Sequence, residues 1–136
     1  MTPRRADLTE AIEDGLSPSW SVRAAAGRRL APYAGLVSAT AVLERLLLDP
    51  EDTLVTRTAA EALLRQGSVA AVRLVARAAA RADDNHGDWL RTAAHDVARE
   101  PGEAGRGVSA ACAVLADDPD GDVRRGAAEV AEWFRR

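Results

Sequence analysis

Apolar and small residues recur in one order at four places along the chain, and this order predicts amphipathic helices. The four segments read "SVRAAAGRRLAPYAG", "LVTRTAAEALLRQG", "DWLRTAAHDVAREPG" and "DVRRGAAEVAEWF". Eight residues after the first apolar position of each segment comes a second apolar residue, so that the two share one helix face. The first positions, spaced 33, 34 and 34 residues apart, are Val22, Val55, Trp89 and Val123, and the second positions are Leu30, Leu63, Val97 and Ala131.

Small side chains fill the three positions between these apolar residues in every segment. A helix with so little apolar bulk is marginal in water on its own, so these positions are useful only where another backbone lies close against them. The sequence therefore predicts close helix contacts at Ala25, Ala26, Gly27, Thr58, Ala59, Ala60, Thr92, Ala93, Ala94, Gly126, Ala127 and Ala128.

A second helical run precedes each segment, and turn-forming residues separate the two. The runs are "ADLTEAIEDGL", "ATAVLERLLLD", "VAAVRLVARAAARAD" and "GVSAACAVLADD", followed by Ser17-Pro18, Asp49-Pro50, Asp83-Asp84-Asn85 and Asp117-Asp118-Pro119. Two-helix units of this length bury their apolar faces by stacking on their neighbours. We expect one all-α domain over 1–136, an α-solenoid of four repeats at about 5–35, 36–67, 68–102 and 103–136.

The series resembles HEAT repeats of the short bacterial kind, the type found in phycobilisome-lyase-like proteins. "DDPDGDVRRGAAEVA" and "VRAAAGRRL" carry the resemblance, and "DPEDTLVTRTAAEALLRQG" and "ARADDNHGDW" look like small actinobacterial members of unassigned activity. The resemblance implies a polar ladder in which the Arg of each Val-Arg pair joins turn carboxylates. Arg23 and Arg124 keep this Arg, whereas Thr56 and Leu90 replace it, which predicts an interrupted ladder. A tetratricopeptide array has a similar period, but its Trp-Leu-Gly-Tyr positions are absent in register.

Composition limits the partners and the compartment. The net charge of −3 disfavours general affinity for nucleic acid or anionic lipid, although all 18 basic residues are Arg and a local basic face is possible. The single cysteine, Cys112, lies in an apolar run and is expected to be a core residue. No segment approaches the roughly 20 apolar residues of a membrane span, so we expect a cytoplasmic protein.

The chain lacks the motifs of common enzymes. It has no glycine-rich phosphate loop, serine elbow or Cys-x-x-Cys, and His95-Asp96 alone cannot replace the several His-Glu pairs of di-iron HEAT-type enzymes. The acidic stretch Asp83–Trp89 could hold a metal through Asp83, Asp84, His86 and Asp88, but helix capping by Asp88 or a neighbour is the interpretation we favour. We therefore predict a non-enzyme, with no catalytic, cofactor-binding or metal-binding residues.

Candidate binding residues lie two and six positions after each repeated apolar position. The HEAT resemblance places the second helices on the concave face, where equivalent residues would form parallel rows. A solvated face with modest i,i+4 ion pairs is the simpler alternative. Because the rows mix both signs of charge, they fit a protein partner better than a phosphate backbone. The predicted partner-binding residues are Arg57, Glu61, Arg91, His95, Arg125 and Glu129.

The functional prediction is a scaffold, adaptor or regulator that binds another protein, and a narrower form of it is an immunity or inhibitor protein. One alternative is a nucleic-acid-binding protein, with Arg57, Arg65, Arg91, Arg99 and Arg125 on a basic face that Glu61 and Glu129 interrupt. A second alternative is a HEAT-type lyase or a metal-dependent enzyme. Trp133 and Phe134 are expected to cap the end of the core, with self-association as the other possibility, and a monomer is favoured.

Overall fold

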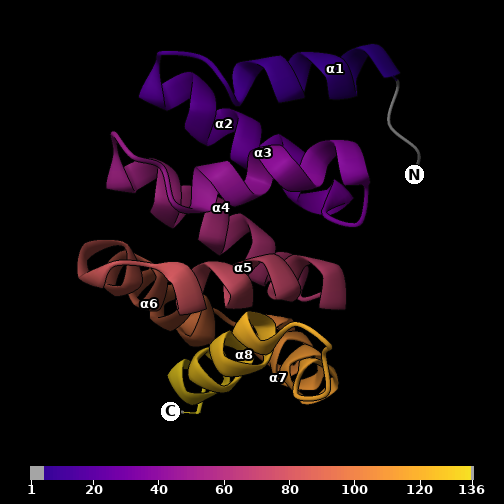
Figure 1. Cartoon of the computed structure of the whole chain (residues 1–136), viewed down its shortest axis with the longest axis vertical. Helices are drawn as coiled ribbons and strands as arrows, with labels where there is room; N and C mark the ends of the chain where they lie inside the picture. The colour runs from indigo at the N-terminus through magenta and orange to yellow at the C-terminus, as the bar shows by residue number, and fades with distance from the viewer. Residues whose placement is uncertain (1–4, 136) are drawn as a thin grey trace.

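The computed structural model describes residues 5–135, and this part of the chain is all-helical with no strand (Figure 1). The helices follow one another from the top to the bottom of the view, with α1 at one end and α7 and α8 at the other. The all-α prediction is thereby confirmed. The elements are α1 (Arg5–Asp14), α2 (Trp20–Leu30), the short 3₁₀ helix η1 (Ala31–Tyr33), α3 (Val37–Leu47), α4 (Thr53–Gln66), α5 (Val69–Arg81), α6 (Asp84–Arg99), α7 (Ala104–Leu115) and α8 (Gly121–Trp133).

Short polar side chains set where most of the helices begin. Asp52, Asp83 and Asp120 each accept a backbone N–H of the helix that follows, and Ser19 and Ser68 do the same for α2 and α5. These bonds satisfy donors that have no partner inside the helix. At the other end of α4, Gly67 takes a left-handed conformation with φ 65°, which glycine adopts without a steric penalty.

One expected turn is in fact helical. The sequence predicts a turn at Asp83-Asp84-Asn85, within the stretch Asp83–Trp89, but α6 already begins at Asp84. If Trp89 were the third residue of its helix, as Val22 and Val55 are of theirs, α6 would begin one turn later. Instead the carboxylate of Asp83 accepts the backbone N–H of His86 and caps the helix at that point. Helix capping is therefore the role of Asp83 and not of Asp88, which lies inside α6.

The first six helices pack in regular order. The even-numbered helices α2, α4 and α6 lie side by side, and α1, α3, α5 and α7 contact one another in sequence. The predicted close approach is confirmed between α2 and α4, where a Cβ added to Gly27 would lie 3.3 Å from the Cβ of Ala59. Ala59 and Ala93 are fully buried, and leucines such as Leu43 and Leu63 fill the core between the pairs.

Helix α8 leaves this order and packs across α5, with little contact to α6. At the crossing point a Cβ on Gly126 would overlap the carbonyl group of Ala76 and lie 3.0 Å from its Cα. Only glycine allows the two backbones to approach so closely. The small residues of "RRGAAEVA" therefore find their partner in α5, two helices earlier than the preceding helix α7.

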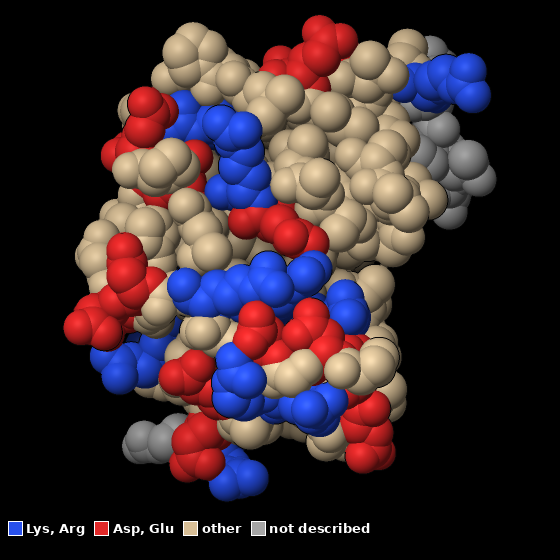
Figure 2. All heavy atoms as spheres, in the orientation of Figure 1, with Lys and Arg blue, Asp and Glu red and all other residues tan. Residues whose placement is uncertain are grey.

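Three ion pairs hold the beginning of α8 against α5. The guanidinium groups of α5 recur every four residues, and the carboxylates that meet them recur every two. Four residues of α-helix advance by about 6 Å, and the carboxylates that meet arginines at this spacing come from the α7–α8 turn and the first turn of α8. Figure 2 shows the result as a band of basic side chains beside acidic ones across the middle of the molecule. The pairs are Arg73–Asp118 at 2.9 Å, Arg77–Asp120 at 3.4 Å and Arg81–Asp122 at 2.9 Å.

A buried ion pair joins the first two helix pairs. Arg23 of α2 forms two hydrogen bonds, of 2.9 and 3.0 Å, to the carboxylate of Asp49 in the α3–α4 turn. Both side chains are more than nine-tenths buried. Thr56 takes the place of the next arginine, and its hydroxyl is buried without a hydrogen-bond partner. The row of buried arginine–carboxylate contacts is thus interrupted at Thr56, as the sequence predicts. His86 of α6, in the next helix pair, contacts the backbone carbonyl of Asp49.

Cys112 is buried in α7, as expected of a core residue. Burial raises the pKa of its thiol, which keeps the sulfur protonated and unreactive at neutral pH. Trp133 and Phe134 are half-buried and pack against the core, so both rings contribute to closing this end of the helical stack.

Candidate protein-binding surface

The six predicted binding residues lie on three helices, two on each. Arg57 and Glu61 are in α4, Arg91 and His95 in α6, and Arg125 and Glu129 in α8. Because α4 and α6 pack side by side, their residues are neighbours on one face. Since α8 packs on α5, only one of its two predicted residues, Glu129, shares a cleft with a predicted residue of α6.

Arg57 and Glu61 are part of an ion-pair network that links α4 to α6. Arg57 bonds Glu61 within α4 at 3.1 Å and Asp96 of α6 at 2.5 Å. The Glu61 hydrogen bond is the main cause of the raised pKa of Arg57. The guanidinium also lies 6.0 Å from the centre of the Trp89 ring, at the limit of a cation–π contact. Arg57 and Glu61 thus form the i,i+4 ion pair that a solvated helix face would have. Both side chains already have partners within the protein.

A second bridge extends this network along the two helices. Arg65 of α4 donates to both carboxylate oxygens of Glu100, just after α6, with distances of 2.6 to 3.2 Å. This bond lowers the pKa of Glu100 and raises that of Arg65. The polar face of α4 is therefore satisfied by α6, and it presents few unpaired groups to a partner.

Arg91 and Glu129 line one cleft between α6 and α8. The cleft encloses about 450 Å³. Alanines from the end of α5 and carboxylates from the beginning of α6 complete it, and the Trp133 ring forms part of its wall. Its lining residues are Ala79, Ala82, Asp83, Asp84, Gly87, Asp88, Arg91, Glu129 and Trp133.

His95 lines an adjoining cavity on the same side of α6. This cavity of about 200 Å³ is bounded by His95, Ala98, Arg99 and Trp133. Trp133, which is half-buried, lines both cavities, so the two meet at this residue. The two cavities are treated as one binding groove beside α6. We call this the α6–α8 groove.

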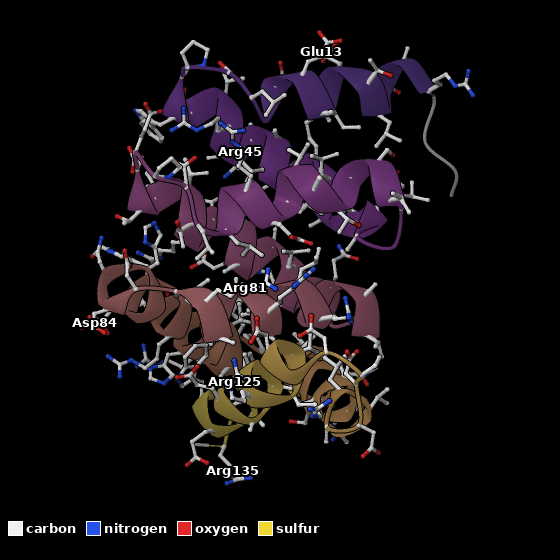
Figure 3. All side chains as sticks on the ribbon, viewed as in Figure 1. Glu13, Arg45, Arg81, Asp84, Arg125 and Arg135 are labelled. Carbon is white, nitrogen blue, oxygen red and sulfur yellow. The ribbon has the colours of Figure 1, made fainter. Side chains whose placement is uncertain are left out.

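Arg125 lies outside the α6–α8 groove. Its guanidinium pairs with Asp122, which also receives Arg81 of α5. Figure 3 shows Arg125 close to Arg81 on the front of the molecule, while Asp84 of α6 lies at the left edge. Hydrogen bonds from Arg81 and Arg125 lower the pKa of Asp122. Arg125 thus joins the α5–α8 contact instead of continuing the row from Arg91.

Two residues of the groove were missed or given another role by the sequence. Trp133 was assigned to the end of the core, and Arg99 was considered only as part of a basic face. The signal that could have found them is the alternation of Asp118, Asp120 and Asp122, which matches the arginines at 73, 77 and 81 and brings α8 onto α5. This match opens the face of α6 and places Trp133 beside it.

The acidic stretch at the beginning of α6 forms hydrogen bonds within the protein. Asp83 caps the helix and bonds the His86 ring, and Asp88 pairs with Arg91 at 3.1 Å. Within residues 5–135, no three histidine, cysteine or acidic side chains are grouped closely enough to hold a metal ion.

Comparison of the chain with models of protein families, with curated proteins and with solved structures finds no match. None of the described helices combines the length and the apolar character needed to cross a membrane.

Proposed function

We propose that this chain is a non-catalytic scaffold of the HEAT-like solenoid class, which binds another protein in the α6–α8 groove. The proposed class draws support from four helix pairs with a sequence period of 33 to 34 residues, and from the ordered packing of α2, α4 and α6. The proposal includes a cytoplasmic setting and an adaptor, regulator or inhibitor role.

The observation that carries the proposal is the grouping of Arg91, His95 and Glu129 around Trp133. Tryptophan and arginine are enriched among residues that dominate protein interfaces, particularly where a ring fills a hollow. The groove also mixes acidic and basic groups, which suits a polar protein segment better than a uniformly charged phosphate backbone.

The rigidity of the scaffold supports the same role. Both helices that flank the groove are fixed by other contacts, α6 by the ion pairs to α4 and α8 by those to α5. A partner therefore meets side chains on an ordered surface, and binding immobilises few additional backbone groups. This preorganisation raises the affinity that a small groove can reach.

The test compares two double charge reversals in the full chain. Arg91→Glu with Arg99→Glu alters the groove, and Arg45→Glu with Arg106→Glu makes the same charge change at exposed positions on α3 and α7. Each protein is used to capture partners from a lysate of the source organism, and the affinity for a captured protein is then measured by calorimetry.

We expect the groove variant to bind the captured protein at least about tenfold more weakly, which corresponds to about 1.4 kcal/mol, and the control variant to bind as wild type. Equal binding by all three proteins would place the interface elsewhere. Salt-dependent binding of wild type to random-sequence duplex DNA would favour the nucleic-acid alternative instead. Arg125→Glu, tested alone, shows whether the site extends beyond the groove.

A further inference from the structure

His86 connects two turns that are far apart in the sequence. Its ring lies in the first turn of α6, with the side chain 16 % exposed. The Nε2 atom is 2.8 Å from the backbone carbonyl oxygen of Asp49 in the α3–α4 turn. The Nδ1 atom is 2.8 Å from a carboxylate oxygen of Asp83, the residue that caps α6. One imidazole therefore joins α6 to the preceding helix pair.

Both partners of the ring are hydrogen-bond acceptors. A backbone carbonyl has no proton to donate, and an ionised carboxylate has none either. A neutral imidazole carries a single N–H and can satisfy only one of them, whereas the imidazolium ion donates from both nitrogens. We propose that His86 is a proton-dependent clip, which holds α6 to the α3–α4 turn when doubly protonated and releases that turn when it loses a proton.

The two bonds differ in strength, and this difference decides which one is released. The bond to the Asp83 carboxylate pairs two opposite charges, and such bonds are roughly twice as strong as neutral ones. The proton therefore leaves Nε2 and stays on Nδ1. The lone pair of Nε2 then faces the lone pairs of the Asp49 carbonyl, and the contact between the helix pairs becomes repulsive.

The charged groups around His86 favour the protonated ring. Asp83 contributes a negative charge from the beginning of α6 itself. Asp49 contributes its carbonyl oxygen and a carboxylate, and Arg23 of α2 binds that carboxylate from the opposite side. The hydrogen bond to Asp49 is the largest cause of the raised pKa of His86, with Asp83 adding to it and partial burial opposing it.

The direction of the pH effect follows from this shift. A histidine whose pKa is higher in the folded chain than in the unfolded chain contributes stability below its unfolded pKa, at about 6.5. That contribution is lost as the pH rises through the folded pKa. The clip is thus closed in mildly acidic solution and opens in alkaline solution. This inference concerns the link between helix pairs and holds whether or not the α6–α8 groove binds a protein.

The decisive experiment follows the ring nitrogens of ¹⁵N-labelled full-length protein by NMR across a pH titration. The chain has two histidines, and His95→Asn identifies the signals of His86. We expect His86 to titrate above about 6.5 and, once neutral, to carry its proton on Nδ1. A pKa at or below that value, or a neutral ring protonated on Nε2, would overturn the proposal, since the bond to Asp49 would then not depend on the second proton.

Two variants separate the clip from the helix cap. Asp83→Asn removes the charge but keeps a good capping residue, so we expect it to lower the pKa of His86 while α6 remains folded. His86→Gln removes the titration. Its melting temperature should fall furthest below that of wild type at about pH 5.5 and approach it at about pH 9. A difference that stays constant with pH would show that His86 acts only by packing.

Discussion

Replacing Gly126 by alanine tests the close contact between the backbones of α5 and α8. In most helix interiors this change adds stability, by about 1 kcal/mol, because alanine has the higher helix propensity. Here the new Cβ would overlap the carbonyl group of Ala76 in α5. The atoms it meets belong to backbone, so no side-chain rotation can relieve the overlap, and α8 has to move away from α5.

The cost can be estimated from that displacement. A separation of about 0.5–1 Å already forfeits a quarter to a half of the dispersion energy of each contact it opens. Overpacking of a tight core contact costs about 1–3 kcal/mol, and in this case the same displacement also stretches the ion pairs of Arg73 and Arg81. Because the overlap is with backbone, the packing cost lies near the upper end of this range, so we expect Gly126→Ala to lower the free energy of unfolding by about 2 kcal/mol after the gain of about 1 kcal/mol in helix propensity.

The assay is thermal and urea unfolding followed by circular dichroism. For a chain of this size, about 1 kcal/mol corresponds to about 3–5 °C in Tm. Gly105→Ala is the matched control, because Gly105 lies in α7 with no atom within 4 Å of an added Cβ, and it should melt at or above the wild-type temperature. If Gly126→Ala melts together with that control, α8 does not cross α5 as described.

Two further outcomes follow from the packing and the charges. Ala59→Leu and Ala93→Leu should each lower the free energy of unfolding by about 1–3 kcal/mol, while Ala41→Leu on the exposed face of α3 stays within about 0.5 kcal/mol of wild type. Hydrogen bonds from Arg73 lower the pKa of Asp118, so this carboxylate stabilises the fold above its unfolded pKa of about 3.9 and less as the pH falls further. Urea midpoints of Asp118→Asn should therefore lie below wild type at neutral pH and converge with it as the pH falls through the lowered pKa of Asp118, and a constant gap would contradict the ion-pair account.

Local sequence patterns were sufficient to predict the helices. The spacing of Val22, Val55 and Val123 places each as the third residue of its helix, as a shared repeat requires. Trp89 is the exception, since it is the sixth residue of α6. Asp83 caps α6 and so sets where this helix begins. The repeat period of the apolar residues gives no sign of the additional helical turn that precedes Trp89.

The position of α8 depends on pairs of residues more than 40 positions apart. Arg73 and Asp118 each look like ordinary exposed charges when considered within one repeat. Their matched spacing has meaning only once α5 and the α7–α8 turn are compared directly. The candidate groove depends on the same long-range contacts. The repeat spacing predicts Arg91 and Glu129 as binding residues, but Trp133 lies beside them only because α8 packs on α5.

The crossing of α5 by α8 also affects how the chain folds. In a regular stack each helix pair contacts only its neighbours, so a terminal pair can unfold while the remainder persists. Here α8 closes back onto a helix of the preceding pair, and α7 contacts both α5 and α8. We therefore expect the last four helices to unfold as one cooperative unit, whereas α1, whose main contacts are with α2 and α3, should open at lower free energy. The two ends of the molecule thus differ in folding cooperativity.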